Sequence, residues 1–211
     1  MKDTTMLRYT QYFGFLILFV SIFGFVEPLL GFIVPITLLL ILVIARVRGR
    51  WSCGNFCPKG SIADIIENIK YRGKRNKMRT PSILKSYWVR IPILLVLLVT
   101  MVNQFIITEG MVEKIGMIFV IRYALTTSIV LILGTGMHSR TWCTLCPGGT
   151  LQKLLEKDKS PLKLESMKCI NCKKCDKICP MNLHVSEGKP GSDCIKCEKC
   201  ISSCPKNALA F

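Results

Sequence analysis

Half of the 211 residues are hydrophobic, which is more than a soluble domain of this size normally buries, so we expect a membrane protein. The formal net charge of +16 arises from 29 Lys and Arg against 13 Asp and Glu. Twelve cysteines could indicate a secreted disulfide scaffold, but their close C-x-x-C spacing and the lack of a cleavable signal pattern favour metal ligation. The basic residues gather in a loop next to hydrophobic segments, which argues against nucleic-acid binding.

Four hydrophobic segments predict four transmembrane helices. The first apolar run is longer than one helix needs to cross a hydrocarbon core of roughly 30 Å, and Glu27 and Pro28 interrupt it. The interruption predicts a tight turn between two spans, whose ends are extended by tyrosines and by arginines that snorkel. We expect the four spans at about residues 9–26, 29–47, 88–107 and 115–137.

Arg122 falls inside the fourth apolar segment and leaves two interpretations open. In the first, residues 113–121 form a short interfacial helix and Arg122 lies near the outer headgroups. In the second, the arginine is an intramembrane charge that pairs with Glu27, Glu109 or Glu113 and serves a proton or quinone site. We favour the interfacial helix.

The charge pattern also predicts sidedness. Residues 46–90 hold twelve basic and two acidic residues, and loops of this kind are retained in the cytoplasm. Two spans separate Cys57 from Cys143, so these cysteines lie on the same side. We therefore expect a multi-pass protein of the cytoplasmic membrane, in contact with lipid, with both termini and all twelve cysteines on the cytoplasmic side.

The sequence contains an internal duplication. The segments "CPKGSIADIIE" (57–67) and "CPGGTLQKLLE" (146–156) match at Cys, Pro, Gly, a hydroxyl residue, several aliphatic positions and Glu. Each copy follows a helical hairpin and predicts an amphipathic helix, which Ser61 or Thr150 caps at its N-terminus. Because each unit has two spans, the copies share one orientation and are related by a pseudo-twofold axis along the membrane normal.

These features divide the chain into two domains. Residues 1–157 form an all-α membrane domain of four transmembrane helices, built as two duplicated hairpins at 9–47 and 88–138. Residues 158–211 form a C-terminal α+β domain. The residues "NALAF" near the end of the chain predict an edge strand of that domain.

The C-terminal domain holds the strongest motif of the sequence. The runs "CINCKKCDKICP" and "CIKCEKCISSCP" each read C-x2-C-x2-C-x3-C-P. Three cysteines of such a run wrap one corner of a cubane cluster, and the fourth ligates the other cluster. Structural zinc also accepts four thiolates, but two tandem runs closed by Cys-Pro favour a two-cluster ferredoxin-like domain. We predict one [4Fe-4S] cluster at Cys169, Cys172, Cys175 and Cys204, and a second at Cys194, Cys197, Cys200 and Cys179.

This arrangement resembles NapH-type membrane-bound ferredoxins, and the wider polyferredoxin group that includes NosR and CcoG shares the core. The resemblance covers nearly the whole chain, from about Tyr9 to Phe211. It implies electron transfer between the quinone pool and a redox partner, or electron delivery for maturing a metalloenzyme. The second membrane-side pair is C-x2-C-P rather than C-x3-C-P, and this sequence lacks the extra soluble domains of NosR and CcoG, so their particular partners do not carry over.

Four cysteines just after the second and fourth spans admit three accounts. A third iron–sulfur cluster would have its thiolates stabilised by iron and by the nearby Arg50 and Arg140. A dithiol or a soft-metal site for Cu(I) is the second account, and reduced structural cysteines behind proline turns are the third. We favour the third cluster. The four residues, called here the membrane-face cysteines, are Cys53, Cys57, Cys143 and Cys146.

Three other features bear on the membrane chemistry. Haem is excluded because a membrane b-type haem needs paired axial histidines, and the histidines of this chain are His138 and His184. His138, at the end of the fourth span, is either solvated at the headgroups, which we favour, or is a proton acceptor beside a quinol headgroup. The basic stretch 70–86 contacts anionic lipid, docks an acidic electron carrier, or does both.

No P-loop, G-x-G-x-x-G, nucleophile elbow or H-E-x-x-H motif is present. We therefore expect an electron-transfer component of an oxidoreductase system, with two [4Fe-4S] clusters, a third site, and quinone as a candidate membrane partner. One alternative is an assembly factor that uses ferredoxin electrons to reduce copper or disulfides at the membrane-face cysteines. Another is an anchor subunit wired into a larger complex. The expected partners are membrane lipid and an acidic redox protein, and not nucleic acid.

Overall fold

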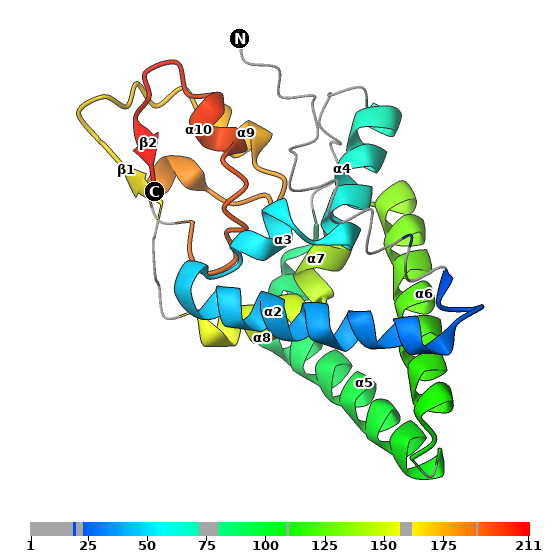
Figure 1. Cartoon of the computed structure of the whole chain (residues 1–211). Helices are drawn as coiled ribbons and strands as arrows, with labels where there is room; N and C mark the ends of the chain where they lie inside the picture. Colours follow the sequence, from blue (N-terminus) through cyan, green and yellow to red (C-terminus); the bar gives the residue numbers. More distant parts are fainter. Residues whose placement is uncertain (1–18, 20–22, 72–79, 109, 157–161, 189) are drawn as a thin grey trace.

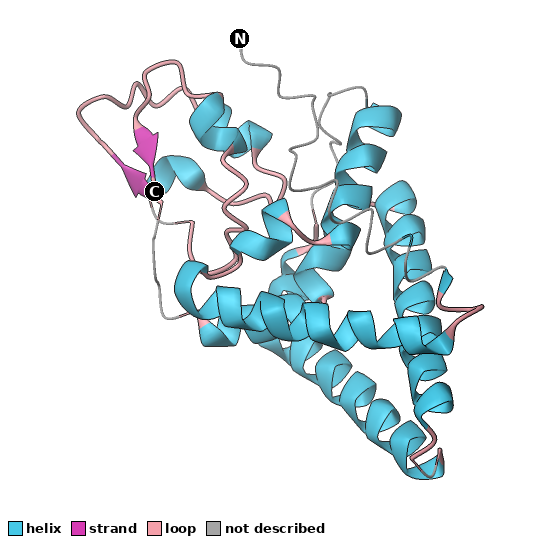
Figure 2. Cartoon of the chain, in the orientation of Figure 1, coloured by secondary structure: helices cyan, strands magenta, loops and turns pink. Residues whose placement is uncertain are grey.

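A computed structural model describes residues 19, 23–71, 80–108, 110–156, 162–188 and 190–211, and these are mostly helical (Figures 1 and 2). Three long helices and the short helices that follow them form one body, and the C-terminal residues form a smaller lobe beside its upper end in Figure 1. The helices are η1 (Pro28–Phe32), α2 (Ile33–Arg48), α3 (Trp51–Asn55), α4 (Pro58–Tyr71), η2 (Ser82–Lys85), α5 (Tyr87–Ile107), α6 (Val112–Gly136), α7 (Thr141–Leu145), α8 (Pro147–Leu155), α9 (Lys174–Ile178), η3 (Val185–Glu187) and α10 (Lys199–Ser202), and the strands are β1 (Lys163–Leu164) and β2 (Leu209–Ala210).

Within the described residues, three helices are long and apolar enough to cross a membrane. The first combines η1 and α2 over Pro28–Arg48, and the others are α5 and α6. They coincide with the second, third and fourth predicted spans. Most of the predicted first span, 9–26, lies outside the described residues, so the total of four remains a prediction. Large apolar side chains such as Leu39, Val99 and Ile132 are exposed along these helices, as a lipid-facing surface requires.

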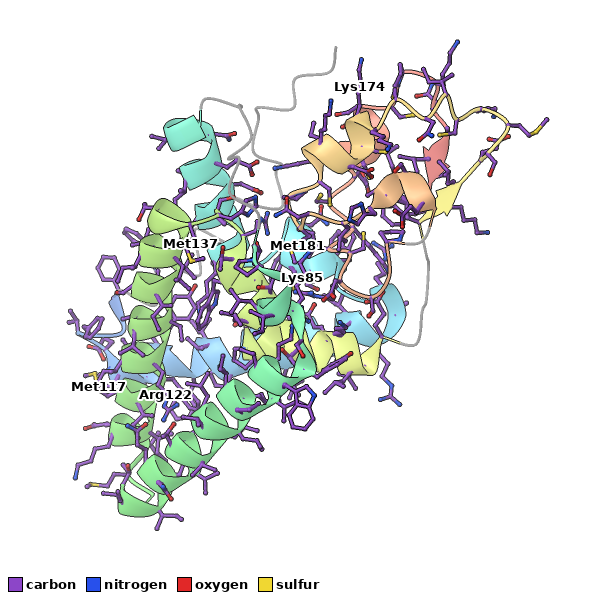
Figure 3. The ribbon with its side chains drawn as sticks, turned by 180° about the vertical axis from the view of Figure 1, so that it is seen from behind. Lys85, Met117, Arg122, Met137, Lys174 and Met181 are labelled. Carbon is purple, nitrogen blue, oxygen red and sulfur yellow. The ribbon has the colours of Figure 1, made fainter. Side chains whose placement is uncertain are left out.

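The expected interfacial helix at 113–121 is wrong. Helix α6 begins at Val112 and passes through Arg122 without a break, so the arginine lies within a candidate span. Its Nε donates a hydrogen bond to Oε1 of Gln104 at 2.9 Å, and Nη1 donates to the carbonyl oxygen of Leu97 at 3.1 Å (Figure 3). Among the described residues, Arg122 therefore bonds polar groups of α5 and not Glu27 or Glu113, and Glu109 lies outside the described residues.

The two sequence repeats have matching structures. In each, a long span is followed by a five-residue helix, a Cys-Pro step and an amphipathic helix: α2, α3 and α4 in the first, and α6, α7 and α8 in the second. The additional residue of the C-x3-C-P motif is Phe56, which separates α3 from α4. One inserted residue therefore leaves the order of elements unchanged.

The repeats exchange their amphipathic helices. Helix α4 packs against α6, the span of the second repeat, and α8 packs against α2, the span of the first. At the first of these contacts, Ile62 and Ile66 of α4 form a buried cluster with Val130 and Trp142. This reciprocal packing brings both Cys-Pro steps to the same end of the long helices (Figure 1).

The predicted capping roles of Ser61 and Thr150 are wrong. Pro58 and Pro147 occupy the first positions of α4 and α8, so each hydroxyl residue lies inside its helix. Each hydroxyl donates to the carbonyl of the preceding Cys-Pro cysteine, at 3.3 Å from Ser61 and 3.1 Å from Thr150. The hydroxyls therefore help to fix the cysteine backbone.

The C-terminal lobe is itself repetitive. Helices α9 and α10 follow the second cysteine of each run and pack against each other. Strand β2, which contains two residues of the predicted "NALAF" strand, pairs antiparallel with β1 through Lys163 with Ala210 and Leu164 with Leu209. In the described part of the chain this pair is the whole sheet, so the complete two-cluster ferredoxin-like fold remains a prediction.

Candidate metal centres

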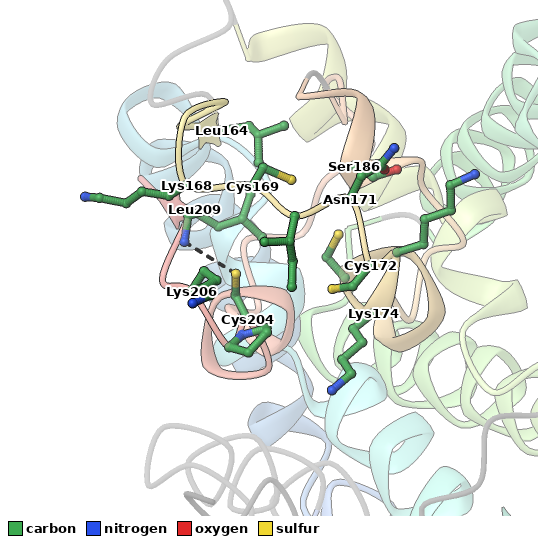
Figure 4. Close-up of a pocket in the computed structure, with 15 residues that line it drawn as sticks. Leu164, Lys168, Cys169, Asn171, Cys172, Lys174, Ser186, Cys204, Lys206 and Leu209 are labelled. Carbon is green, nitrogen blue, oxygen red and sulfur yellow. Dashed lines mark hydrogen bonds between the residues drawn. The ribbon is translucent and has the colours of Figure 1, made fainter.

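The four cysteines of the first predicted set line one pocket of the C-terminal lobe (Figure 4). The sulfur atoms of Cys169, Cys172 and Cys204 turn toward the same space. The amide of Ala208 donates to the sulfur of Cys204 at 3.4 Å. Cys172 is exposed, whereas Cys169, Cys175 and Cys204 are partly buried. The pocket thus has one edge open to solvent.

The second predicted set also gathers, deeper in the lobe. Cys179 and Cys200 are buried; Cys200 lies within electrostatic range of the other three cysteines, and Cys179 within range of Cys194 and Cys200. Burial and the charges of neighbouring thiolates raise the pKa of Cys200 to about 12, and burial raises that of Cys194 to about 11. Thiolates in such a place need a cation or a cluster to stabilise their charge.

The two cysteine runs share one backbone conformation. The residues immediately before and after the second cysteine of each run have positive φ, as does the third residue after each Cys-Pro cysteine. Left-handed backbone is rare for residues other than glycine, and it turns successive N–H groups toward one point, as in nests that bind Fe–S groups. This conformation fits both loops to iron–sulfur clusters. The paired residues are Asn171 (50°) and Lys196 (50°), Lys173 (54°) and Glu198 (57°), and Asn182 (52°) and Asn207 (49°).

The membrane-face cysteines of the two repeats lie within electrostatic range of one another. Burial and the charges of the other three thiolates raise the pKa of Cys57 to about 12. Burial also raises the pKa of Cys53, although the charge of Arg50 opposes the shift. The thiol of Cys53 donates to Oε1 of Gln152 at 3.4 Å. The four thiols therefore lie within electrostatic range of one another, and the site that they form and the group that it binds remain predictions.

A pair of equivalent arginines crosses between the repeats at this site. Arg50 donates from Nη2 to the carbonyl oxygen of Cys143 at 2.7 Å, and Arg140 donates from Nη1 to the carbonyl oxygen of Cys53 at 3.1 Å. Both guanidinium groups are fully buried, and in the described structure the Nε of each has no hydrogen-bond partner. Two buried cations with a spare donor each suit an anionic group held by thiolates.

Glycines make room for these arginines. A Cβ on Gly60 would lie 2.9 Å from Nη1 of Arg140, and a Cβ on Gly149 would lie 2.7 Å from Nη2 of Arg50. Gly60 and Gly149 are the third residues after Cys57 and Cys146, so the same glycine of the repeat serves the same purpose twice.

Asp193 joins the C-terminal lobe to the membrane domain. It precedes the first cysteine of the second run and accepts from Nη1 of Arg90 at 2.9 Å, Nζ of Lys153 at 2.9 Å and Nη1 of Arg50 at 3.2 Å. Burial alone would raise the pKa of Asp193, but the hydrogen bonds from Lys153 and Arg90 lower it below its usual value. The carboxylate is thus the shared countercharge of three cations.

Two lysines of the second run form ion pairs of the opposite polarity, with the cation on the lobe and the carboxylate on the membrane domain. Nζ of Lys196 lies 3.0 Å from Oε1 of Glu156. Nζ of Lys199 lies 3.2 Å from Oδ1 of Asp64 and 3.6 Å from Oε2 of Glu67. The carboxylate of Asp64 also accepts from Arg140 at 2.7 Å. Charges of both signs therefore fix the orientation of the lobe.

Close backbone contacts support the same orientation. Gly54 of α3 has no side chain at the place where the carbonyl oxygen of Ile195 and the Cβ of Cys197 approach. On another side, Nζ of Lys85 donates to the carbonyl oxygens of Met181 and Asn182 at 3.1 and 3.2 Å (Figure 3). The second cysteine run therefore lies directly against the membrane-face cysteines.

His138 is not solvated, contrary to the favoured expectation. It is 2% exposed, and its Nδ1 accepts from the amide of Arg140 at 3.2 Å. With Glu67, Lys177 and Cys179 it lines a cavity where the lobe meets the membrane domain. The turn after α6 folds back under the lobe, which buries the imidazole. Its role as a quinone proton acceptor remains a prediction.

Sequence reasoning missed the charged residues that connect the two domains: Asp64, Arg90, Lys153, Glu156, Asp193, Lys196 and Lys199. The one signal available was the rarity of acidic residues in 46–90, of which Asp64 is one. Among the described residues, no three His, Cys, Asp or Glu side chains lie close enough together to hold a single metal ion. Residues 72–79 of the basic stretch 70–86 lie outside the described residues.

Comparison with known proteins bears on these sites. A family model described as a 4Fe-4S binding domain matches residues 30–77 and 123–164. Each match contains one Cys-Pro step of the membrane face. An uncharacterized protein of Methanocaldococcus jannaschii is 27% identical over 154 residues, which are 72% of this chain and 60% of that protein. The match therefore spans less than two thirds of the relative. No solved structure matches.

The family match supports an iron–sulfur protein of the ferredoxin type that binds 4Fe-4S clusters. Because both matches end before the two cysteine runs, the duplicated membrane unit has a 4Fe-4S likeness of its own. The three apolar helices are consistent with a membrane protein.

Proposed function

We propose that this protein is a NapH-like electron carrier that passes single electrons between the quinone pool of the cytoplasmic membrane and a soluble redox partner. The 4Fe-4S match and the three apolar helices support iron–sulfur chemistry at a membrane. The proposal further takes a fourth span from residues 9–26 and a cytoplasmic position for all twelve cysteines, in keeping with the basic loop.

Three groups of four cysteines would hold the clusters, and bound clusters supply one-electron transfer. Cys169, Cys172, Cys175 and Cys204 form the first group, and Cys179, Cys194, Cys197 and Cys200 form the second. The membrane-face cysteines form the third, in which Arg50 and Arg140 stabilise negative charge.

One observation carries the proposal furthest. Cys53 and Cys143 of the membrane face share a buried apolar cluster with Cys179 and Cys200 of the lobe. Such a cluster excludes water from the space between two sets of thiols and holds them rigidly together. The side chains that complete it are Leu162, Met181, Val185, Ile195 and Leu209. The packing suits electron passage between membrane and lobe.

His138 is the proposed proton acceptor for quinol. Because Nδ1 accepts from the amide of Arg140, the neutral ring carries its hydrogen on Nε2, and uptake of a proton at Nδ1 would break that hydrogen bond. Glu67 lines the same cavity and is the second proposed acceptor.

The test uses protein purified anaerobically and reconstituted into liposomes. A menaquinol analogue should reduce the bound clusters, as followed by EPR. The matched variant Cys57→Ser/Cys146→Ser should keep the clusters of the lobe but lose most of the reduction rate with quinol, while dithionite still reduces it. No reduction of the wild-type protein by any quinol, with clusters intact, would reject the quinone assignment. Copper in place of iron at the membrane face would favour the metalloreductase alternative.

A further inference from the structure

The two cysteine runs of the lobe repeat at a spacing of 25 residues, and one of them is already docked. In the second run, Ile195 is 1% exposed and its carbonyl approaches Gly54 of α3. Lys199, the first residue of α10, reaches Asp64 and Glu67. The docked run therefore contacts the membrane domain in two ways. Its isoleucine is buried in the middle of the contact, and its lysine pairs with two carboxylates.

The corresponding surface of the first run is uncovered. Ile170, which corresponds to Ile195, is 59% exposed. Lys174, which corresponds to Lys199, is the first residue of α9 and is exposed, and no acidic group of the described residues pairs with it. Cys172 is exposed, whereas its counterpart Cys197 packs against α3. The recognition surface is thus present twice but used within the chain once.

The free surface is more basic than the docked one, although Lys196 of the second run corresponds to the neutral Asn171 of the first. Asp193 corresponds to Lys168, and Glu198 corresponds to Lys173, so two acidic positions of the second run are basic in the first. Lys206 adds a further exposed cation beside the same pocket. Lys168 has a solvent-exposed partner in Glu165, at 2.8 Å, which neutralises little of the field. The lysine collar, defined as Lys168, Lys173, Lys174 and Lys206, surrounds the pocket of Cys172 (Figure 4).

We propose that the lysine collar and Ile170 form the docking surface for the soluble partner, and that this partner is an acidic one-electron carrier protein. The inference rests on the proposed function and places the contact at the first cysteine run instead of at the basic stretch 70–86. The loop between β1 and α9 lies on the outer side of the lobe, away from α5 and α6 (Figure 1). Opposite charge speeds encounter, and an exposed Cys172 brings the partner close to the pocket.

Flavodoxin, a soluble acidic flavoprotein, is the probe. The full-length holoprotein in detergent is reduced with dithionite, excess reductant is removed, and oxidised flavodoxin is added. For each electron that the protein loses, one flavin gains one electron and one proton from solvent. The second-order rate is measured from 20 to 500 mM salt, and flavodoxin affinity is titrated separately. Cytochrome c, whose contact face is basic, is the opposite probe.

The test variant is Lys173→Gln/Lys174→Gln/Lys206→Gln, and the control is Arg46→Gln/Lys114→Gln/Lys163→Gln, which removes three exposed charges elsewhere. The test variant should lose about tenfold in rate and in affinity for flavodoxin at low salt, and most of the salt dependence. The control should stay within about twofold, and the rate with cytochrome c should not fall. Equal losses in both variants, or no loss in the test variant, would overturn the proposal.

Two outcomes separate this inference from the proposed function. If flavodoxin binds the wild type but not the test variant, and no electron passes in either, the docking surface stands and the proposed function fails. If electrons pass at equal rates in all three proteins, the function stands and the surface is elsewhere. If the collar variant loses binding to liposomes of anionic phospholipid and keeps its flavodoxin affinity, the collar is a lipid contact and the proposal is wrong.

Discussion

The guanidinium of Arg140 donates to the carbonyl oxygen of Cys53, 3.1 Å away in the other repeat. Arg50 returns the contact to Cys143 at 2.7 Å. Each repeat therefore holds the first cysteine of the other. Since both arginines are fully buried, the membrane-face site forms only when the two halves of the membrane domain are assembled.

Replacing Arg140 with Met should destabilise the protein by about 3–5 kcal/mol, because Asp64 loses its 2.7 Å partner while buried. The double variant Arg140→Met/Asp64→Asn should cost less than the sum of the single changes. Thermal unfolding in detergent, followed by circular dichroism, gives the three values. Arg46→Met, at an exposed position of α2, is the control. Strict additivity would contradict the buried pair.

Gly60→Ala should cost about 1–3 kcal/mol, because its Cβ would lie 2.6 Å from the carbonyl oxygen of Cys53 as well as close to Arg140. Gly149→Ala should cost less, since the group it meets first is the end of the Arg50 side chain. Gly136→Ala meets nothing within 4 Å and should be neutral or slightly stabilising. The ranking of unfolding midpoints is the measurement, and a larger loss for Gly136→Ala would refute the packing described.

Asp193→Asn should loosen the lobe from the membrane domain. Arg50 and Arg90 are 1% exposed, and the change leaves both without a carboxylate at a cost of about 3–5 kcal/mol. Hydrogen exchange in the segment 194–200 should become faster. Glu187→Gln, at an exposed carboxylate of the same lobe, should leave exchange unchanged. Unchanged exchange in Asp193→Asn would show that the triple contact does not hold the lobe.

Arg122→Gln should weaken the hairpin of α5 and α6 by about 1–3 kcal/mol. The shorter glutamine side chain cannot replace both hydrogen bonds that the guanidinium donates to Gln104 and to the Leu97 carbonyl. The iron content should not change, since the membrane-face cysteines lie at the other end of α6. A variant that folds normally and keeps its iron but is no longer reduced by quinol would point to the proton or quinone role considered from the sequence.

The sequence was sufficient for features that repeat or run along the chain. Hydropathy located three described spans, and the internal duplication paired Cys57 with Cys146. The sequence was insufficient where the position of a side chain depends on residues that are distant in the chain. Arg50 and Asp193 are 143 positions apart, and no local pattern relates them. Arg122 was misplaced for the same reason, because its hydrogen-bond partner Gln104 belongs to another helix.

His138 illustrates a second limit. A histidine at the end of a hydrophobic segment is usually solvated, and for this reason the sequence predicted a solvated His138. The structure buries it because the turn after α6 lies beneath the C-terminal lobe, with Glu67 and Cys179 lining the same cavity. Burial of this kind follows from how two domains meet.

The most direct measurement is iron and acid-labile sulfide per chain in the anaerobically purified wild type and in Cys57→Ser/Cys146→Ser. Three four-thiol sites predict roughly twelve iron atoms in the wild type and roughly eight in the variant, with the lobe's EPR signals retained. Roughly eight iron atoms in both proteins would contradict a cluster at the membrane face, and zinc in place of iron would contradict the whole account.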